Sequence, residues 1–148
     1  MDAINIAQSI AKVFEGFRSK PYRCPAGVPT IGYGSTSYPN GRKVTLKDPP
    51  ITPQAAVEMM DHELNKCLAS SLKYCPGLIN EPSGRLGAIT DFVYNLGAGR
   101  LQCSTLRRRI NQKNWPEVAY ELKRWVRGGG KVLPGLVARR GVEERYVK

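Results

Sequence analysis

The sequence predicts an α+β protein, mainly a helical bundle with a small antiparallel β-sheet lobe. Apolar residues follow helical spacing before residue 18 and after residue 52. Between these stretches Pro and Gly are frequent, and Pro39-Asn40-Gly41 is typical of a hairpin turn. We expect one domain over residues 1–148, with a β lobe at about 18–50, a helical lobe at about 52–148 that includes the N-terminal helix, and a ligand cleft between the lobes.

The first helix is predicted from apolar residues that recur on one face of a 3.6-residue period. Asp2 is suited to the N-cap and Gly16 to the position just after the last turn, so the helix should end near Glu15. The face is formed by Ile6, Ile10, Val13, Phe14 and Phe17.

The segment from residue 18 to residue 50 should form two or three short antiparallel strands. The runs TIGYG and RKVTL have strand-like content, and Asn-Gly tolerates the positive φ of a type I′ turn. So small a sheet needs a helix to pack against.

From Thr52 onward the chain should be helical to its end. Thr52-Pro53 predicts an N-cap followed by proline, at the start of a helix of about 20 residues. Its inward stripe is Ala56, Met60, Leu64, Cys67, Leu68 and Ser71. Further helices are expected from Ser83 to the break at Gly97–Gly99, at Ser104–Asn111, from the capping pair Asn114 and Glu117 to Val126, and at Gly135–Tyr146, with a loop at Arg127–Lys131.

The strongest signal in the composition is charge. Lys and Arg number 23 against 12 Asp and Glu, a net charge of +11, which favours encounter with polyanions. Nucleic acid is not expected as a partner, because the cations are scattered and no recognition motif is present. No run of 18 apolar residues occurs, so no membrane span is expected.

No metal or cofactor is expected. The four cysteines include no C-x-x-C pair, and His62 is the one histidine, so zinc spacing is absent. A local disulfide between Cys67 and Cys75 and a pair of reduced thiols both remain open at this stage.

Glu15 is the candidate general acid. The negative pole of the helix dipole and the flanking Phe14 and Phe17 should both raise its pKa, and a general acid must hold a proton near neutral pH. The alternative is an ordinary solvated glutamate at a helix end.

The stretch FEGFRSKPYRCPAGVPTIGYGST resembles the signature of phage-type lysozymes, the endolysins of glycoside hydrolase family 24. Those enzymes carry Glu, eight residues, Asp or Cys, five residues, Thr and then a GYG turn, as Glu15, Cys24, Thr30 and Gly32–Gly34 do here. The resemblance continues in FVYNLGAGRLQCSTLRRRIN and GGKVLPGLVARRGVEER, so it extends from Glu15 to Arg145.

The resemblance implies a lysozyme-like fold and hydrolysis of the β-1,4 bond between N-acetylmuramic acid and N-acetylglucosamine in peptidoglycan, with lysis of the bacterial host. It implies that Glu15 donates the proton, that Thr30 holds the attacking water and that Cys24 replaces the more common Asp. The Cys24 thiolate would act as base, electrostatic stabiliser or nucleophile, with its pKa lowered by Lys20 and Arg23. A purely structural cysteine is the alternative.

Tyr33, Asn95 and Arg100 are expected to contact the saccharide; the alternatives are a hairpin side chain for Tyr33 and a helix-cap cluster for the other two. Arg139 and Arg140 are expected mainly at a solvated surface, with an inward arginine that orients an acid as the alternative.

Two other functions stay open from the sequence: a lytic transglycosylase that uses one acid, and a basic binding module without catalysis. We expect a monomer whose partner is peptidoglycan. The N-terminus does not resemble a secretory signal, so the resemblance implies accumulation in the host cytoplasm and access to the wall after the membrane is opened.

Overall fold

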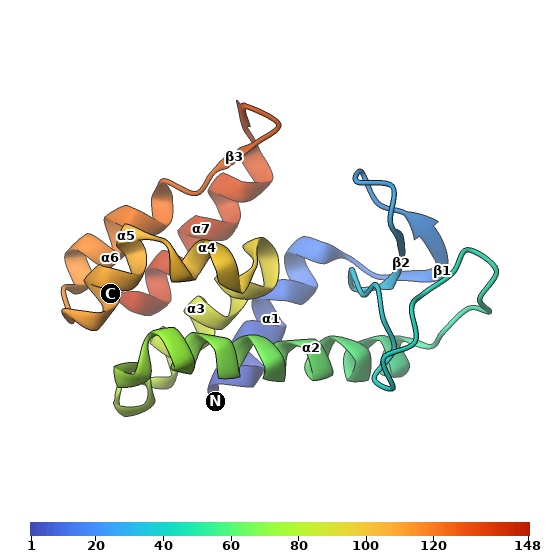
Figure 1. Ribbon diagram of the computed structural model, residues 1–148, viewed down its shortest axis with the longest axis horizontal. Helices are drawn as coiled ribbons and strands as arrows, with labels where there is room; N and C mark the ends of the chain where they lie inside the picture. Colours follow the sequence, from blue (N-terminus) through green and yellow to red (C-terminus); the bar gives the residue numbers. More distant parts are fainter. The chain divides into compact units, whose positions relative to one another are not determined.

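Helix α1 (Ala3–Glu15) begins and ends as the sequence predicts in the computed structural model, which describes residues 1–148 (Figure 1). Asp2 Oδ1 accepts a hydrogen bond from the Asn5 N–H at 2.8 Å, and Gly16 has a φ of 69°. The predicted face is partly wrong, because Val13 is 76% exposed and Phe17 also lies at the surface. Alanines take the inward positions beside the two isoleucines, so the buried face is Ala3, Ile6, Ala7, Ile10 and Ala11.

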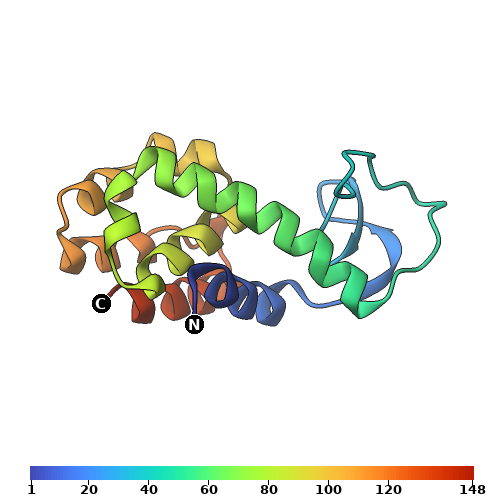
Figure 2. The same cartoon turned by 90° about the horizontal axis from the view of Figure 1, so that it is seen from below.

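The chain divides into two units, and the α+β class is confirmed. The sheet unit comprises residues 11–63, and the helical unit comprises residues 1–10 together with residues 64–148. Helix α2 (Pro53–Tyr74) is one continuous helix (Figure 2) whose first half belongs to the sheet unit and whose second half belongs to the helical unit. That both units form one domain stays a prediction.

The sheet unit contains one antiparallel pair, β1 (Arg18–Arg23) and β2 (Pro29–Gly32). Tyr22 lies opposite Thr30, and a bulge interrupts the register toward Arg18. The run RKVTL was predicted as strand-like but makes only one isolated bridge, between Ser37 and Lys43. A turn is present at the predicted place, since the Gly41 N–H donates to the Tyr38 carbonyl at 2.9 Å. It is not the predicted type I′ turn, because Gly41 has a positive φ and Asn40 does not.

Side-chain hydrogen bonds to Asp48 hold the segment around RKVTL, which lacks the backbone hydrogen bonds of a regular β-strand. Asp48 accepts hydrogen bonds from the Tyr38 hydroxyl at 2.6 Å, from the Thr45 N–H at 3.0 Å and from Arg42 at 3.2 Å. These donors, the Tyr38 hydroxyl first, hold the pKa of the Asp48 carboxyl well below its usual range. The sheet unit packs on the helix as expected, with a core of Ile31, Val44 and Met59 covered by Tyr38 and Ile51.

Helix α2 begins at the predicted cap, where the Ala55 N–H donates to Thr52 Oγ1 at 3.1 Å. Its stripe is buried at Ala56, Met60, Leu64 and Ser71. The short 3₁₀ helix η1 (Pro76–Asn80) follows the predicted break.

The helical unit continues with five more helices (Figures 1 and 2): α3 (Ser83–Leu96), α4 (Ala98–Gln102), α5 (Thr105–Asn111), α6 (Trp115–Lys123) and α7 (Pro134–Val147). The predicted cap at Asn114 accepts from the Glu117 N–H, and Ser104, predicted as the first residue of its helix, is the N-cap that accepts from the Arg107 N–H. The predicted break at 97–99 is shorter, because α4 already begins at Ala98.

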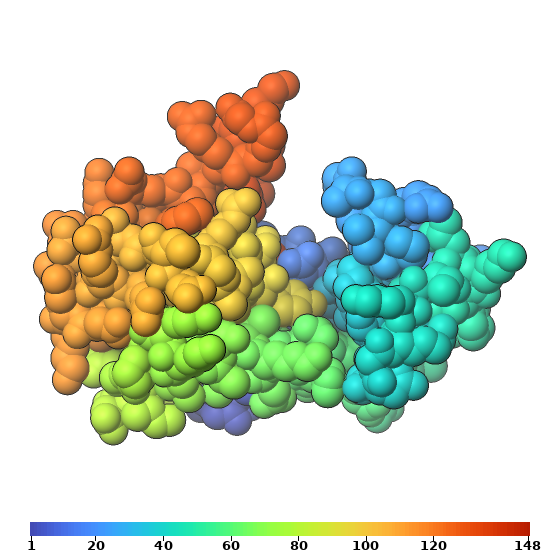
Figure 3. Space-filling model, in the orientation of Figure 1, coloured from blue at the N-terminus to red at the C-terminus, as the bar shows by residue number.

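Two predictions at the end of the chain are corrected. Helix α6 ends at Lys123, not Val126. The predicted loop at 127–131 contains a small hairpin of β3 (Arg127–Gly128) and β4 (Lys131–Val132), which stands out from the surface of the helical unit (Figure 3). Its turn uses Gly129 and Gly130, both with positive φ.

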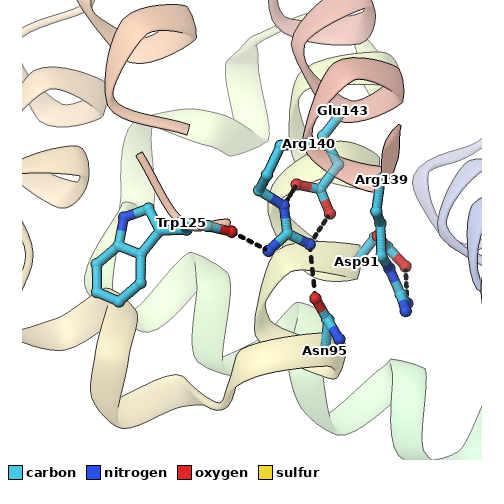
Figure 4. A network of polar contacts seen from close by, with 6 residues as sticks. All are labelled: Asp91, Asn95, Trp125, Arg139, Arg140 and Glu143. Atoms are coloured by element: carbon cyan, nitrogen blue, oxygen red, sulfur yellow. Dashed lines mark hydrogen bonds and ion pairs between the residues drawn. The ribbon is translucent and has the colours of Figure 1, made fainter. Parts of the chain in front are cut away.

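Arg139 and Arg140 are buried, which corrects the predicted solvated surface (Figure 4). Arg139 holds Asp91 through two hydrogen bonds of 2.9 and 2.7 Å. Arg140 pairs with Glu143, with 2.7 Å between Nε and Oε1, and its Nη2 also donates to Asn95 Oδ1 at 2.8 Å. Burial first and Asp91 second raise the pKa of Glu143, while Arg140 opposes the rise. These pairs join α3 to α7 beside the core residue Phe92.

All four cysteines are free thiols, so Cys67 and Cys75 form no disulfide here. Cys75 is fully buried, and burial raises the pKa of its thiol to about 11. No helix combines the length and the apolar character needed to cross a membrane.

We predict that Asp91→Asn lowers the free energy of unfolding by about 3–5 kcal/mol, because it removes the buried carboxylate that accepts two hydrogen bonds from the buried Arg139. Denaturant unfolding followed by circular dichroism measures the change. The control is Lys123→Ala: its amine is exposed, and Glu144 keeps a second partner in Lys148 at 2.8 Å, so the cost should stay below about 1 kcal/mol. Equal losses in the two variants would contradict the assignment.

Candidate active site

Glu15 lies at the last position of α1, where Gly16 turns the chain toward β1. Its carboxyl lies over Gly34, because a methyl group placed at position 34 would stand 3.2 Å from Glu15 Oε1. The end of α1 and the turn after β2 therefore meet at this carboxyl. Gly34 is a contact that sequence reasoning missed, although GYG marked the turn.

The turn Gly32–Gly34 follows β2 directly. Gly32 and Gly34 have φ values of 67° and 86°, which glycine adopts without strain. Ile31 and Ser35 close the turn by exchanging two backbone hydrogen bonds of 2.9 Å. Tyr33 at its tip places its ring 5.6 Å from that of Phe17. Tyr33 therefore packs against Phe17, two positions after Glu15, and its contact with saccharide stays a prediction.

The loop before β2 presents Cys24. The Cys24 N–H donates to the Val28 carbonyl at 3.0 Å, and the Gly27 N–H donates to the Cys24 carbonyl at 2.7 Å. Arg23 Nη1 donates to the Gly27 carbonyl at 2.9 Å and so braces the loop. A tight turn results, whose backbone N–H groups face the half-buried thiol.

The pKa of the Cys24 thiol is lowered, chiefly by the Val28 N–H. Partial burial opposes this, and the Ala26 N–H lowers the pKa further. The expected lowering is thus present with a different cause, since backbone amides supply it and not the charges of Lys20 and Arg23. Composition gave no signal for this effect, because every residue except proline has an N–H.

Thr30 lies on β2 next to this loop and is 3% exposed. Its hydroxyl donates to the Val28 carbonyl at 2.8 Å, and its side chain also contacts the Cys24 sulfur. The structure therefore brings Cys24 and Thr30 together around Val28, and it brings Glu15 to the turn that ends the same strand. All belong to the sheet unit.

Asn95 and Arg100 belong to the helical unit. The Asn95 amide oxygen is held by Arg140 (Figure 4), and Arg100 is exposed at a cavity of about 520 Å³ that is also lined by Arg124 and Trp125. The structure thus gives Asn95 a structural contact, and the saccharide contacts of both residues remain predictions.

Comparison with known proteins identifies the family. The phage lysozyme family matches residues 12–143, and the chain belongs to that family. The SAR-endolysin of Bacteriophage PS119 is 35% identical over 129 residues, which are 87% of this chain and 73% of that protein.

Solved structures agree with this assignment. The endolysin from Escherichia coli O157:H7 phage FAHEc1 has a TM-score of 0.87 at 27% identity, with 99% of this chain and 93% of that chain covered. A P22 lysozyme mutant has a TM-score of 0.80 at 25% identity, with 95% and 93% covered. The expected fold and enzyme class, a glycoside hydrolase of the lysozyme type that acts on peptidoglycan, are confirmed.

We predict that Gly34→Ala lowers lytic activity by about 10- to 100-fold, because its methyl group displaces the Glu15 carboxyl and small displacements of a reacting group are costly. Gly41→Ala is the matched control: Gly41 also has a positive φ, of 90°, but a methyl group there meets nothing within 4 Å. Both variants should lose about 1–2 kcal/mol of stability from the left-handed backbone. Turbidity assays on cell walls should separate them, and equal activity would contradict the role of Gly34.

Proposed function

We propose that this endolysin hydrolyses the β-1,4 bond between N-acetylmuramic acid and N-acetylglucosamine with Glu15 as proton donor and the Cys24 thiolate beside a water held by Thr30. The arrangement of the sheet unit supports the proposal: one four-residue strand, β2, has the Cys24 loop before it and the Gly34 contact with Glu15 after it. An acid at the end of α1 and an anion in the loop before β2 thereby lie at the two ends of one short strand.

The chemistry requires two groups with different protonation states. A glycosidase needs a proton for the leaving oxygen and a base or anion near the water that attacks. Glu15 supplies the proton and the Cys24 thiolate, stabilised by the Val28 N–H, supplies the anion. Thr30 donates its own proton to Val28, so its oxygen is oriented as an acceptor for a water proton.

No cofactor is part of this proposal, and the partner is peptidoglycan. We propose that the enzyme works as a monomer, that it accumulates in the cytoplasm of the bacterial host and that it reaches the wall once the membrane is permeabilised. The surplus of cations supports encounter with an anionic envelope.

The test of the acid is Glu15→Gln, which keeps the shape but cannot transfer a proton. We expect loss of at least about 100-fold in lytic activity with an unchanged unfolding midpoint. Glu58→Gln, an exposed glutamate of the same unit, should remain fully active. Reducing-end analysis of the products belongs to the same experiment, since a new reducing sugar means hydrolysis and an anhydro-sugar would overturn it in favour of transglycosylation.

The test of the anion compares Cys24→Asp with Cys24→Ser. Aspartate is ionised at neutral pH and should keep substantial activity, whereas serine should lose most of it. Wild-type activity should fall as the pH drops through the lowered pKa of the Cys24 thiol, because protonation removes the anion. In Cys24→Asp this acidic limb should move to lower pH.

Cys103→Ser is the control, because Cys103 is an exposed free thiol, and it should leave the pH profile unchanged. A Cys24→Ser enzyme as active as wild type between pH 5 and 9 would make Cys24 structural.

A further inference from the structure

The helical unit contains a pocket of about 400 Å³ where the end of α2, η1, α5 and the start of α6 meet. Its walls include three cations, Lys73, Arg107 and Lys113, and two aromatic side chains, Tyr74 and Trp115. These cations come from three separate segments, which can be followed in Figure 1 at the end of α2 and along α5. None of the three has a role in the proposed hydrolysis.

The positive charge of this pocket is not balanced by its own acids. No salt bridge joins Lys73, Arg107 or Lys113 to a carboxylate, whereas Glu81, the acid in the wall, is held by Arg85 at 2.6 Å. A concave wall with an excess of one sign of charge concentrates ions of the opposite sign. The pocket therefore selects an anion.

The guanidinium of Arg107 is held in place before any ligand arrives. Its Nε donates to the Tyr74 carbonyl at 2.9 Å and its Nη1 to the Gln102 carbonyl at 3.2 Å. It also lies 4.9 Å from the centre of the Tyr74 ring. A fixed donor loses little conformational freedom on binding, and the planar guanidinium suits the oxygens of a phosphate.

Lys113 occupies a backbone conformation that disfavours it. Its φ is 56°, and no other residue except glycine has a positive φ in this structure. The position directly follows the last turn of α5, where glycine or asparagine is the usual choice. A lysine kept in a strained conformation at the wall of a cationic pocket points to a use for its amine.

The two aromatic side chains of the pocket indicate which chemical group the ligand carries besides its anion. Trp115 is half-buried, and Arg85 covers its ring at 4.0 Å. Tyr74 and Trp115 provide apolar surface beside the cations, and an aromatic face suits a sugar ring. The volume is that of a small-molecule site, too confined for a polymer groove. We propose that this pocket is a binding site for a phosphorylated saccharide.

The experiment is a titration of the full ¹⁵N-labelled chain with N-acetylglucosamine 1-phosphate, followed by NMR. Amides around the pocket and the Trp115 indole should shift together. Inorganic phosphate should bind more weakly at the same residues, and N-acetylglucosamine should not bind. Equal affinity for AMP would overturn the saccharide assignment, and shifts spread over other basic surfaces would overturn the site.

Variants then separate the pocket from general charge. Lys73→Gln with Lys113→Gln should weaken binding at least tenfold, whereas the matched pair Lys47→Gln with Lys131→Gln removes two exposed lysines elsewhere and should not. Equal weakening in both pairs would mean non-specific attraction. All four changes should leave hydrolysis of a short neutral oligosaccharide unaffected, so failure here is distinct from failure of the proposed reaction.

Lys113→Gly gives a second and independent readout. Glycine relieves the positive φ, so the unfolding midpoint should rise while affinity for the sugar phosphate falls. A purely structural lysine would give the reverse, a lower midpoint with unchanged affinity, and that result would overturn the proposal. To identify the source of the ligand, lipopolysaccharide micelles are compared with phosphatidylglycerol vesicles. Sedimentation with the micelles alone assigns an envelope-bound saccharide, and sedimentation with neither assigns a free sugar phosphate. Binding to phosphatidylglycerol that the pocket lysines control would contradict the saccharide requirement.

Discussion

The candidate active site depends on a strand of only four residues, β2, whose two ends are tightly turned. The turn before it is closed by the hydrogen bond from the Cys24 N–H to the Val28 carbonyl, and the turn after it by the pair Ile31 and Ser35. A short strand with two closed ends leaves the chain little freedom. Cys24, Thr30 and Gly34 therefore keep fixed positions, and the Glu15 carboxyl lies directly over Gly34. Preorganisation of this kind is what a catalytic site requires.

Backbone N–H groups, and not charged side chains, lower the pKa of the Cys24 thiol. A nearby lysine or arginine would lower the pKa of Cys24 as well, but its effect would weaken as salt screens the charge. The Val28 N–H, which does most to lower the pKa of the thiol, is a fixed dipole and is screened much less. A net charge of +11 favours long-range attraction to an anionic envelope. Attraction to the envelope and stabilisation of the Cys24 thiolate therefore depend on different groups. We expect ionic strength to change the rate of encounter with the substrate more than the rate of the chemical step.

Local patterns predicted the ends of the helices well, because caps act through neighbouring residues. Asp2, Thr52 and Asn114 all cap as expected. Patterns failed where distant segments decide. Val13 fits the helical period but is exposed, because the buried face of α1 is formed by alanines and isoleucines on another side of the helix.

The arginines show the same limit more clearly. Arg139 and Arg140 were predicted mainly at the surface because Asp91, the partner of Arg139, lies 48 positions away, and Asn95, a partner of Arg140, lies 45 positions away. Only the spacing of Arg140 and Glu143, one helical turn, was a local sign of a pair. At the candidate active site, Glu15, Cys24 and Thr30 were predicted from a spacing that resembles the phage-type lysozyme signature, whereas the Val28 N–H and the Gly34 contact depend on how the hairpin closes and have no side-chain signature.

The arginines of the helical unit differ in whether a carboxylate neutralises their charge. Arg139 and Arg140 are each matched by a carboxylate, so they contribute to cohesion and leave no net field. Arg107 is matched only by carbonyl groups, which orient it without cancelling its charge. A cation that is oriented but not neutralised stabilises the fold less than a paired one, because a carbonyl offers a dipole where a carboxylate offers a full charge. The charge of Arg107 therefore remains available to an external anion. Lys73 and Lys113 line the same pocket and add two more positive charges to it.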